Sequence, residues 1–265
     1  MARVDLLLPK PVTPPGDHVP VSADTVARPG RGSTTALFSD GLALHGRQPA
    51  LITAHRSVDY AELDDLVTEA AARFGSGRRL VLIGAANRVE AVVAYLAALR
   101  AQQPVVLAPE DAGMRAGLVA AYDPDIIVTS DSGWRMEERR ASTVHVLHPD
   151  LALLLSTSGT TGSPKLVRLS RQNLQSNAAA IATYLGLTSR DRAITTLPMQ
   201  YCYGLSVINS HLHAGAGIVL NDLSVVDRCF WQSVAESGVT GMAGVPHTFD
   251  LLDRAGFADM RVPTL

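Results

Sequence analysis

The 265-residue sequence has few cysteines, almost balanced charge and no long hydrophobic run. Its two cysteines, Cys202 and Cys229, cannot form a disulfide framework, and no C-x-x-C or Cys/His cluster indicates a metal site. This cysteine usage is typical of a reducing compartment, so we predict a cytoplasmic protein. The formal net charge of −2 provides no field that would attract nucleic acid or an anionic membrane, and we expect neither partner.

Hydrophobic stretches are short throughout the chain. The apolar residues near the start are interrupted by Asp5 and are too few for a signal peptide. No run reaches the length needed to cross a bilayer, so we predict no membrane span.

Residues 1–33 differ in composition from the rest of the chain. They are rich in proline and glycine without periodicity, and prolines are dense between Pro9 and Pro20. Proline removes a backbone donor and breaks helices and central strands, so we predict a flexible N-terminal arm over residues 1–33. We expect regular structure to begin at Thr34, which is placed to cap a helix over residues 36–45.

From residue 50 onward, short apolar strands alternate with helical patterns. The predicted strands cover residues 50–53, 57–59, 80–83, 104–107, 125–128, 144–147, 151–155, 166–169, 193–196, 218–220 and 239–242. The predicted helices cover residues 60–74, 89–99, 112–121, 170–185, 205–213, 226–236 and 247–255. This alternation is typical of an α/β fold with mainly parallel sheets and helices on both faces.

The segment from Ser156 to Lys165 reads Ser-Thr-Ser-Gly-Thr-Thr-Gly-Ser-Pro-Lys and follows an apolar strand. Glycines and small hydroxyl residues let a backbone wrap closely around an anion, and one cation completes such a site. The ordered residue choice is too specific for an ordinary turn. A nucleoside-triphosphatase P-loop requires a different glycine spacing, and Pro164 precedes the lysine here. The chain also has no dinucleotide-binding G-x-G-x-x-G after a strand and no G-x-S-x-G elbow.

This segment resembles the phosphate loop of the adenylate-forming enzymes, the AMP-binding superfamily of acyl-CoA synthetases, adenylation domains and luciferases. Four further segments, individually weaker, resemble the same family: residues 57–63, 95–107, 197–206 and 244–249. The resemblance extends from about residue 50 to residue 265. It implies the N-terminal subdomains of an adenylate-forming enzyme, with ATP and Mg²⁺ as cofactors.

The family's reaction gives the loop its expected role. A carboxylate attacks the α-phosphate of ATP, pyrophosphate leaves, and the acyl-adenylate passes to a thiol of CoA or a carrier-protein phosphopantetheine. By resemblance, the loop contacts the β- and γ-phosphates through Thr157, Ser158, Gly159, Thr160, Thr161, Gly162, Ser163 and Lys165. Lys165 would offset charge on the departing pyrophosphate; the alternative is a solvated loop lysine. Thr160 or Thr161 is a candidate Mg²⁺ contact.

Three residues after position 200 are candidate substrate contacts. By resemblance, Tyr201 lies where many acyl-CoA synthetases place an aromatic residue or histidine that gates the acyl tunnel. The alternative is that Tyr201 and Tyr203 pack in the core. Gly204 aligns with an aspartate that pairs with the amine in α-amino-acid adenylation domains, and glycine cannot supply that charge. We therefore expect a fatty, aryl or similar acid without an α-amine, with an amino-acid adenylation domain as the alternative.

Other polar residues have simpler expected roles. His211 and His213 are two apart on a predicted helix, so they face different directions and make a poor metal pair. We expect both to be structural, Asn173 to lie in the first turn of its helix, and Asp250 and Asp253 to be solvated.

Several later segments of the family have no match in this sequence, namely those that hold adenine and ribose, the hinge, and the C-terminal lid with its adenylation lysine. We therefore expect residues 34–265 to be a truncated N-terminal adenylating domain, inactive by itself. A small carboxylic acid and an acyl carrier protein are the expected partners. The alternatives are a naturally short binding or regulatory protein, half of a split enzyme, or an unrelated anion-binding α/β enzyme.

Overall fold

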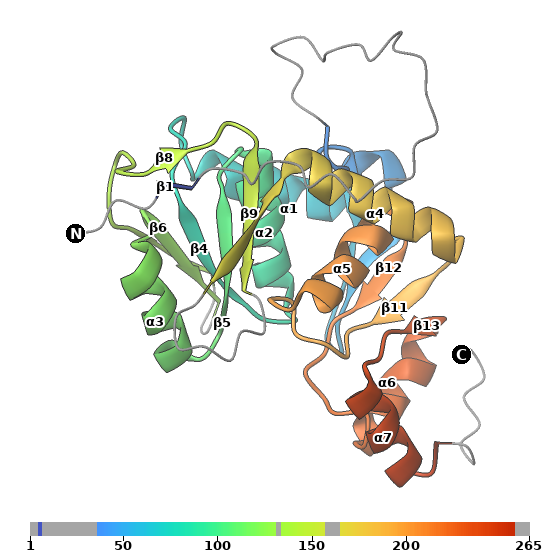
Figure 1. Ribbon diagram of the computed structural model, residues 1–265. Coiled ribbons are helices and arrows are strands. Elements are labelled where there is room, and N and C mark those ends of the chain that lie inside the picture. Colours follow the sequence, from blue (N-terminus) through green and yellow to red (C-terminus); the bar gives the residue numbers. More distant parts are fainter. Residues whose placement is uncertain (1–4, 7–35, 131–133, 157–164, 258–265) are drawn as a thin grey trace, which may run out of the picture.

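The computed structural model describes residues 5–6, 36–130, 134–156 and 165–257 (Figure 1). The predicted arm over residues 1–33 therefore lies outside the described residues, apart from the short strand β1 (Asp5–Leu6), which pairs with β8 (Val146–Leu147). The phosphate loop over residues 157–164 also lies outside them. The described residues form two large sheets separated and flanked by helices.

The first large sheet has six strands in the order β10-β9-β5-β4-β6-β7. Its four central strands run parallel and are β9 (Leu151–Ser156), β5 (Val105–Pro109), β4 (Val81–Ala85) and β6 (Ile126–Thr129). The two antiparallel edge strands are β10 (Leu166–Ser170) and β7 (Arg135–Glu138).

The second large sheet has five strands in the order β13-β11-β12-β2-β3. Its parallel strands are β13 (Gly241–Met242), β11 (Arg192–Ile194), β12 (Gly217–Val219) and β2 (Pro49–Ile52). The antiparallel edge strand is β3 (Ser57–Asp59).

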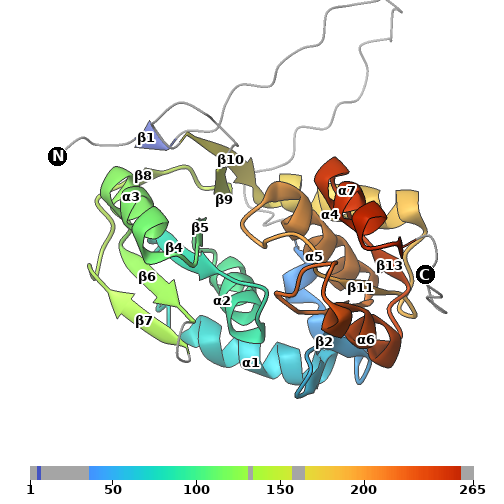
Figure 2. The same cartoon turned by 90° about the horizontal axis from the view of Figure 1, so that it is seen from below.

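Helices form a shared inner layer and two outer layers (Figures 1 and 2). The helices whose buried residues join the core shared by the two sheets are α1 (Tyr60–Ala72), α2 (Val89–Arg100), α4 (Arg171–Leu185) and α5 (Cys202–Ala214). The outer face of the six-stranded sheet is covered by α3 (Ala112–Tyr122). The outer face of the five-stranded sheet is covered by α6 (Arg228–Ser237) and α7 (Pro246–Arg254).

Strand β4 shows how the sequence produces these layers. Side chains alternate across a strand, so Val81 and Ile83 pack into the shared inner core while Leu82 packs under α3. All three are at most 1% exposed because helices cover both faces of the sheet. A strand that is buried on both faces has a continuous apolar sequence, as β4 does. The two large, mainly parallel sheets confirm the predicted α/β class.

The structure differs from the sequence-based expectation most clearly in three places. Residues 36–45 form two 3-10 helices, η1 (Phe38–Asp40) and η2 (Leu42–His45), instead of one helix, and they meet at Gly41. Strand β7 was not expected because its sequence, Arg-Met-Glu-Glu, is a polar edge strand without an apolar run. Helix α5 begins three residues before the predicted start, and glycine at position 204 weakens the helical signal of that first turn.

Candidate active-site crevice

The two residues that flank the predicted phosphate loop, Ser156 and Lys165, lie at the carboxyl edge of the six-stranded sheet. Strand β9 ends at Ser156 and runs parallel to β5, so both strands end on the same edge. Lys165 precedes β10, whose first residue, Leu166, pairs with Ser156. Ligands of open α/β sheets bind in the crevice outside the carboxyl ends of the strands. The roles of Thr157, Ser158, Gly159, Thr160, Thr161, Gly162 and Ser163 stay predictions, because these residues lie outside the described part of the chain.

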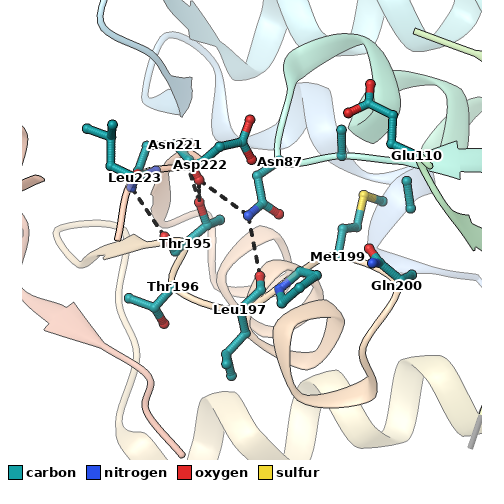
Figure 3. Close-up of a pocket in the computed structure, with 13 residues that line it drawn as sticks. Asn87, Glu110, Thr195, Thr196, Leu197, Met199, Gln200, Asn221, Asp222 and Leu223 are labelled. Atoms are coloured by element: carbon teal, nitrogen blue, oxygen red, sulfur yellow. Dashed lines mark hydrogen bonds between the residues drawn. The ribbon is translucent and has the colours of Figure 1, made fainter. Parts of the chain in front are cut away.

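A cavity of about 270 Å³ opens where the carboxyl ends of the two sheets meet (Figure 3). Its wall combines residues at or just after the ends of β4, β5, β11 and β12. These residues are Ala85, Ala86, Asn87, Glu110, Thr195, Thr196, Leu197, Pro198, Met199, Gln200, Asn221, Asp222 and Leu223. The cavity is therefore a feature of the tertiary structure, built from four separate parts of the sequence.

Asn87 forms hydrogen bonds between the two sheets at this edge. Its amide nitrogen Nδ2 donates to the carbonyl oxygens of Leu197 and Asn221 at 3.4 and 3.3 Å (Figure 3). Thr195 and Asn221 are also joined, because the Thr195 hydroxyl donates to the Asn221 carbonyl at 2.9 Å and the Asn221 amide donates to the Thr195 carbonyl at 3.2 Å. These bonds fix the relative position of the residues that follow β4, β11 and β12.

Charged residues at the same edge form a bridge between the sheets. Arg88, the N-cap residue of α2, lies 3.1 Å from Glu110 and 3.9 Å from Asp222. Glu110 follows β5 of one sheet and Asp222 follows β12 of the other. All three side chains are partly exposed, so solvent screens the two ion pairs and each contributes little to stability.

The candidate substrate residues lie next to this cavity. Tyr201 is the N-cap residue of α5 and directly follows Gln200 of the cavity wall. Tyr201 and Tyr203 are 40% and 41% exposed, so neither tyrosine packs in the core. A Cβ atom at Gly204 would lie 2.4 Å from the Pro198 carbonyl oxygen and 2.9 Å from that of Leu197. Packing alone therefore accounts for glycine at position 204.

The remaining polar residues have the structural roles expected of them. His211 is 7% exposed, and its Nδ1 lies 2.8 Å from the Val207 carbonyl, while burial lowers the pKa of the imidazole. His213 instead faces Gln175, with 3.3 Å between Nδ1 and Nε2. Among the described residues, no group of three or more potential ligands could hold a metal ion.

Two further expectations are confirmed at helices α4 and α7. Ser170 caps α4, and its hydroxyl accepts from the backbone N–H of Asn173 at 3.1 Å. Asp250 and Asp253 are exposed on α7.

Within the described ranges, no helix combines the length and apolar character that a transmembrane span requires.

Sequence reasoning did not identify Asn87, Glu110 or Asp222. Their position in the sequence was the available signal, because each residue follows closely on a predicted apolar strand. In parallel sheets, functional side chains commonly lie just after the carboxyl ends of the strands. Which of the two sheets each strand joined, and that the sheet edges meet, could not be read from the sequence.

A family model described as AMP-binding enzyme matches residues 103–264. The chain therefore belongs to the AMP-binding, adenylate-forming enzyme family, as the resemblance implied. The match includes the phosphate loop, most of the cavity wall and helix α5.

Two of the relatives are acid–CoA ligases. The chain is 27% identical over 253 residues to an oxalate–CoA ligase of Arabidopsis thaliana, a match that covers 78% of this chain and 49% of the relative. It is 32% identical over 144 residues to a sulfoacetate–CoA ligase of Cupriavidus necator, covering 54% of this chain and 25% of the relative. The chain thus spans half or less of the length of these curated relatives.

Solved structures show the same fold. VinN in complex with L-aspartate matches 87% of this chain and 67% of its own chain, with a TM-score of 0.71 and 24% identity. O-succinylbenzoate CoA synthetase from Bacillus subtilis in complex with AMP matches 82% of this chain and 64% of its own, with a TM-score of 0.68 and 24% identity.

Proposed function

We propose that this chain forms the first part of an ATP-dependent ligase that joins a carboxylic acid to a thiol. The acid is activated as an acyl-adenylate and then transferred to CoA or to the phosphopantetheine of a carrier protein. The observation that carries this proposal is the match to the AMP-binding family, together with the position of Ser156 and Lys165, the two ends of the predicted phosphate loop, at the carboxyl edge of the sheet. Several relatives of this chain are acid–CoA ligases.

The phosphate loop supplies the pyrophosphate side of the site in this proposal. Backbone N–H groups and hydroxyls from Thr157 to Ser163 contact the β- and γ-phosphates, and Lys165 offsets charge on the leaving pyrophosphate. The implied Mg²⁺ fits this set of groups, because Mg²⁺ prefers oxygen ligands and phosphates, with the Thr160 or Thr161 hydroxyl completing the set. When bound, Mg²⁺ neutralises phosphate charge.

The acid occupies the crevice between the sheets, and it has no α-amine. Oxalate and sulfoacetate, the acids in the names of two relatives, lack this group. Gly204 has no room for the aspartate that would pair with it. Tyr201 and Tyr203, at the start of α5, border the acyl path. Adenylation of an α-amino acid is the second candidate, since the chain is also 27% identical over 261 residues to the non-ribosomal peptide synthetase CmlP of Streptomyces venezuelae.

Lys165 provides the first test of the phosphate role. We expect pyrophosphate to raise the melting temperature of the chain, and Lys165→Ala to remove most of that rise because the cation is lost. Arg190→Ala is the matched control, since Arg190 is another exposed cation, in the turn before β11. An equal pyrophosphate shift in wild type and Lys165→Ala would exclude the proposed role of this lysine.

Pyrophosphate release tests the reaction. The full-length protein is expected to release pyrophosphate from ATP with a carboxylic acid that lacks an α-amine. Release with α-amino acids alone would establish the second candidate in its place. The 265-residue chain alone is expected to show no turnover, since it spans only about half of such ligases. Turnover by the isolated chain would contradict that expectation.

A further inference from the structure

We propose that the first eight residues of this chain bind to the outer face of the six-stranded sheet, in an apolar groove between α3 and β8. The inference goes beyond the proposed function, because none of the described residues that line this groove lines the crevice. Its basis is a strand pairing already present in the structure, in which β1 (Asp5–Leu6) lies beside β8 (Val146–Leu147) (Figure 1).

The groove has a volume of about 1070 Å³ and is lined by residues along the length of α3. Ala112, Ala116 and Ala120 are spaced four apart, so they share one face of the helix and leave room beside it. The segment 143–146 supplies another part of the wall, and its Val144 and Val146 are 49% and 50% exposed. An exposed apolar surface of this kind marks an interaction site.

Charged groups at the C-terminal end of α3 are paired within the protein. Arg139 lies 2.9 Å from the carboxylate of Asp123, and Nε2 of His145 lies 2.9 Å from the carbonyl oxygen of Asp123. The groove therefore offers a ligand mainly apolar surface, together with the backbone of residues 143–146. An apolar strand fits such a surface better than a charged ligand does.

The pairing of β1 with β8 sets the direction in which the N-terminal segment runs. The two strands are parallel. Extended toward the N-terminus, the same register brings Val4 opposite His145 and Arg3 opposite Val144, and both of these partners line the groove. The segment thus adds to β8 as a strand, held by backbone hydrogen bonds and selected by its alternate side chains.

The sequence of the segment has the alternation that this strand requires. Apolar residues occupy every second position, namely Ala2, Val4, Leu6 and Leu8. Successive side chains of a strand point to opposite faces, so these four share a face. Because Leu6 is opposite Leu147, which packs against the core beneath α3, that face is directed at the core. Arg3 and Asp5 are directed at solvent, and Pro9 ends the pattern because it lacks a backbone donor.

Binding in the groove anchors both ends of the predicted N-terminal arm. After β1, the next described segment begins at Ala36, and Leu37 and Phe38 are buried in the core shared by the two sheets. Residues 9–35 then connect two anchored segments, one on the outer face of a sheet and one in the inner layer. The same contact removes the apolar wall of the groove from solvent.

Disulfide trapping in the 265-residue chain tests both the position and the register. Cys202 and Cys229 are exposed and are first replaced by serine. Arg3→Cys with Val144→Cys should then form a disulfide within one chain about tenfold faster than Leu7→Cys with Val144→Cys. The second pair is four residues out of register, about 13 Å apart along the strands, which is beyond the reach of a disulfide. Mass spectrometry and non-reducing electrophoresis measure the rates under oxidised glutathione.

The outcomes separate the possible occupants of the groove. Equal rates for the two pairs overturn the inference, because a segment that is not held in the groove reaches Val144 equally well from either position. Disulfides only between two chains also overturn it and assign the groove to the N-terminal segment of a second copy. These measurements need neither ATP nor an acid, so every outcome leaves the proposed function untouched.

Groove variants locate the contact. Ala116→Gln places a longer polar side chain in the groove and should slow the in-register disulfide about tenfold, the value of one buried aliphatic side chain. Val4→Asp should slow it to a similar extent, whereas Asp5→Asn should leave the rate unchanged. Gly117→Gln is the control on α3, because Gly117 lies outside the groove wall and has nothing within 4 Å of a Cβ atom. An unchanged rate in both Ala116→Gln and Val4→Asp overturns the inference.

Discussion

Helices α2 and α3 follow neighbouring strands of the same sheet and are both rich in apolar residues, yet they are buried to very different extents. In α2, ten of twelve residues are buried, whereas in α3 only Leu118 is. Helix α2 lies in the layer between the two sheets, and α3 covers the outer face of one sheet (Figure 1). The comparison teaches that apolar composition permits burial, while the layer that a helix occupies decides how much of its surface is buried.

Truncation of a buried leucine in α2 gives the largest expected effect. Leu96 is fully buried between the sheets, so Leu96→Ala should reduce the free energy of unfolding by about 3 kcal/mol. The matched change in α3 is Met114→Ala, since Met114 is 64% exposed, and it should alter stability by no more than about 0.5 kcal/mol. Urea denaturation of both variants measures the difference. Similar losses would show that the two helices do not differ in the way described.

Two glycine-to-alanine substitutions, each of which adds one methyl group, test the same comparison between the inner and outer layers. Gly204, in α5 of the inner layer, faces the Leu197 and Pro198 carbonyls, and Gly204→Ala should cost about 1–3 kcal/mol through overpacking. Gly117 lies inside α3 with nothing within 4 Å of a Cβ atom, so Gly117→Ala should stabilise the protein by about 0.5–1 kcal/mol. Denaturation midpoints of the two variants should therefore move in opposite directions. A shift of both midpoints in the same direction would refute this account of the packing.

The smallest expected effect is a pH dependence from the inner layer. Burial lowers the pKa of His211 in α5 from its usual 6.5, so the unfolded state binds the proton more readily than the folded state. The stability that depends on neutral His211 is fully present above pH 6.5 and is lost as the pH falls toward the lower folded pKa. His211→Gln should therefore flatten the stability profile between pH 7.5 and 5, measured by urea denaturation. His55→Gln, at an exposed position between β2 and β3, should retain the wild-type profile. A steeper loss of stability in acid for His211→Gln would contradict the sign.

The parts of the fold that were predictable are those with local signals. Strands β4 and β5 are continuous apolar runs, and Ser170 is a capping residue in front of an apolar helical pattern, so their existence followed from periodicity and capping. Strand β7 was missed because an edge strand of Arg, Met and Glu has no apolar alternation. Residues 36–45 were apolar enough for a helix, but Gly41 divides them into two short turns.

The candidate site also has one part that the sequence predicted and one part that it did not. The 156–165 segment carries its chemistry in consecutive residues, and it predicted the family that the comparison then confirmed. The cavity is not formed by consecutive residues, because Asn87, Glu110, Thr195 and Asn221 come from four separate strand ends. Their relation depends on strand order, which long-range pairing decides.

The sequence by itself determined the alternation of strands and helices and the family, and it carries the loop from which the phosphate role is predicted. These properties depend on residues close together in the chain, through hydrogen-bond periodicity and the side chains of one loop. Only the tertiary structure decided that the two sheet edges meet, that α2 is enclosed while α3 is not, and that Gly204 faces two carbonyls. These properties arise when segments distant in the sequence pack together, and no local pattern of residues encodes them.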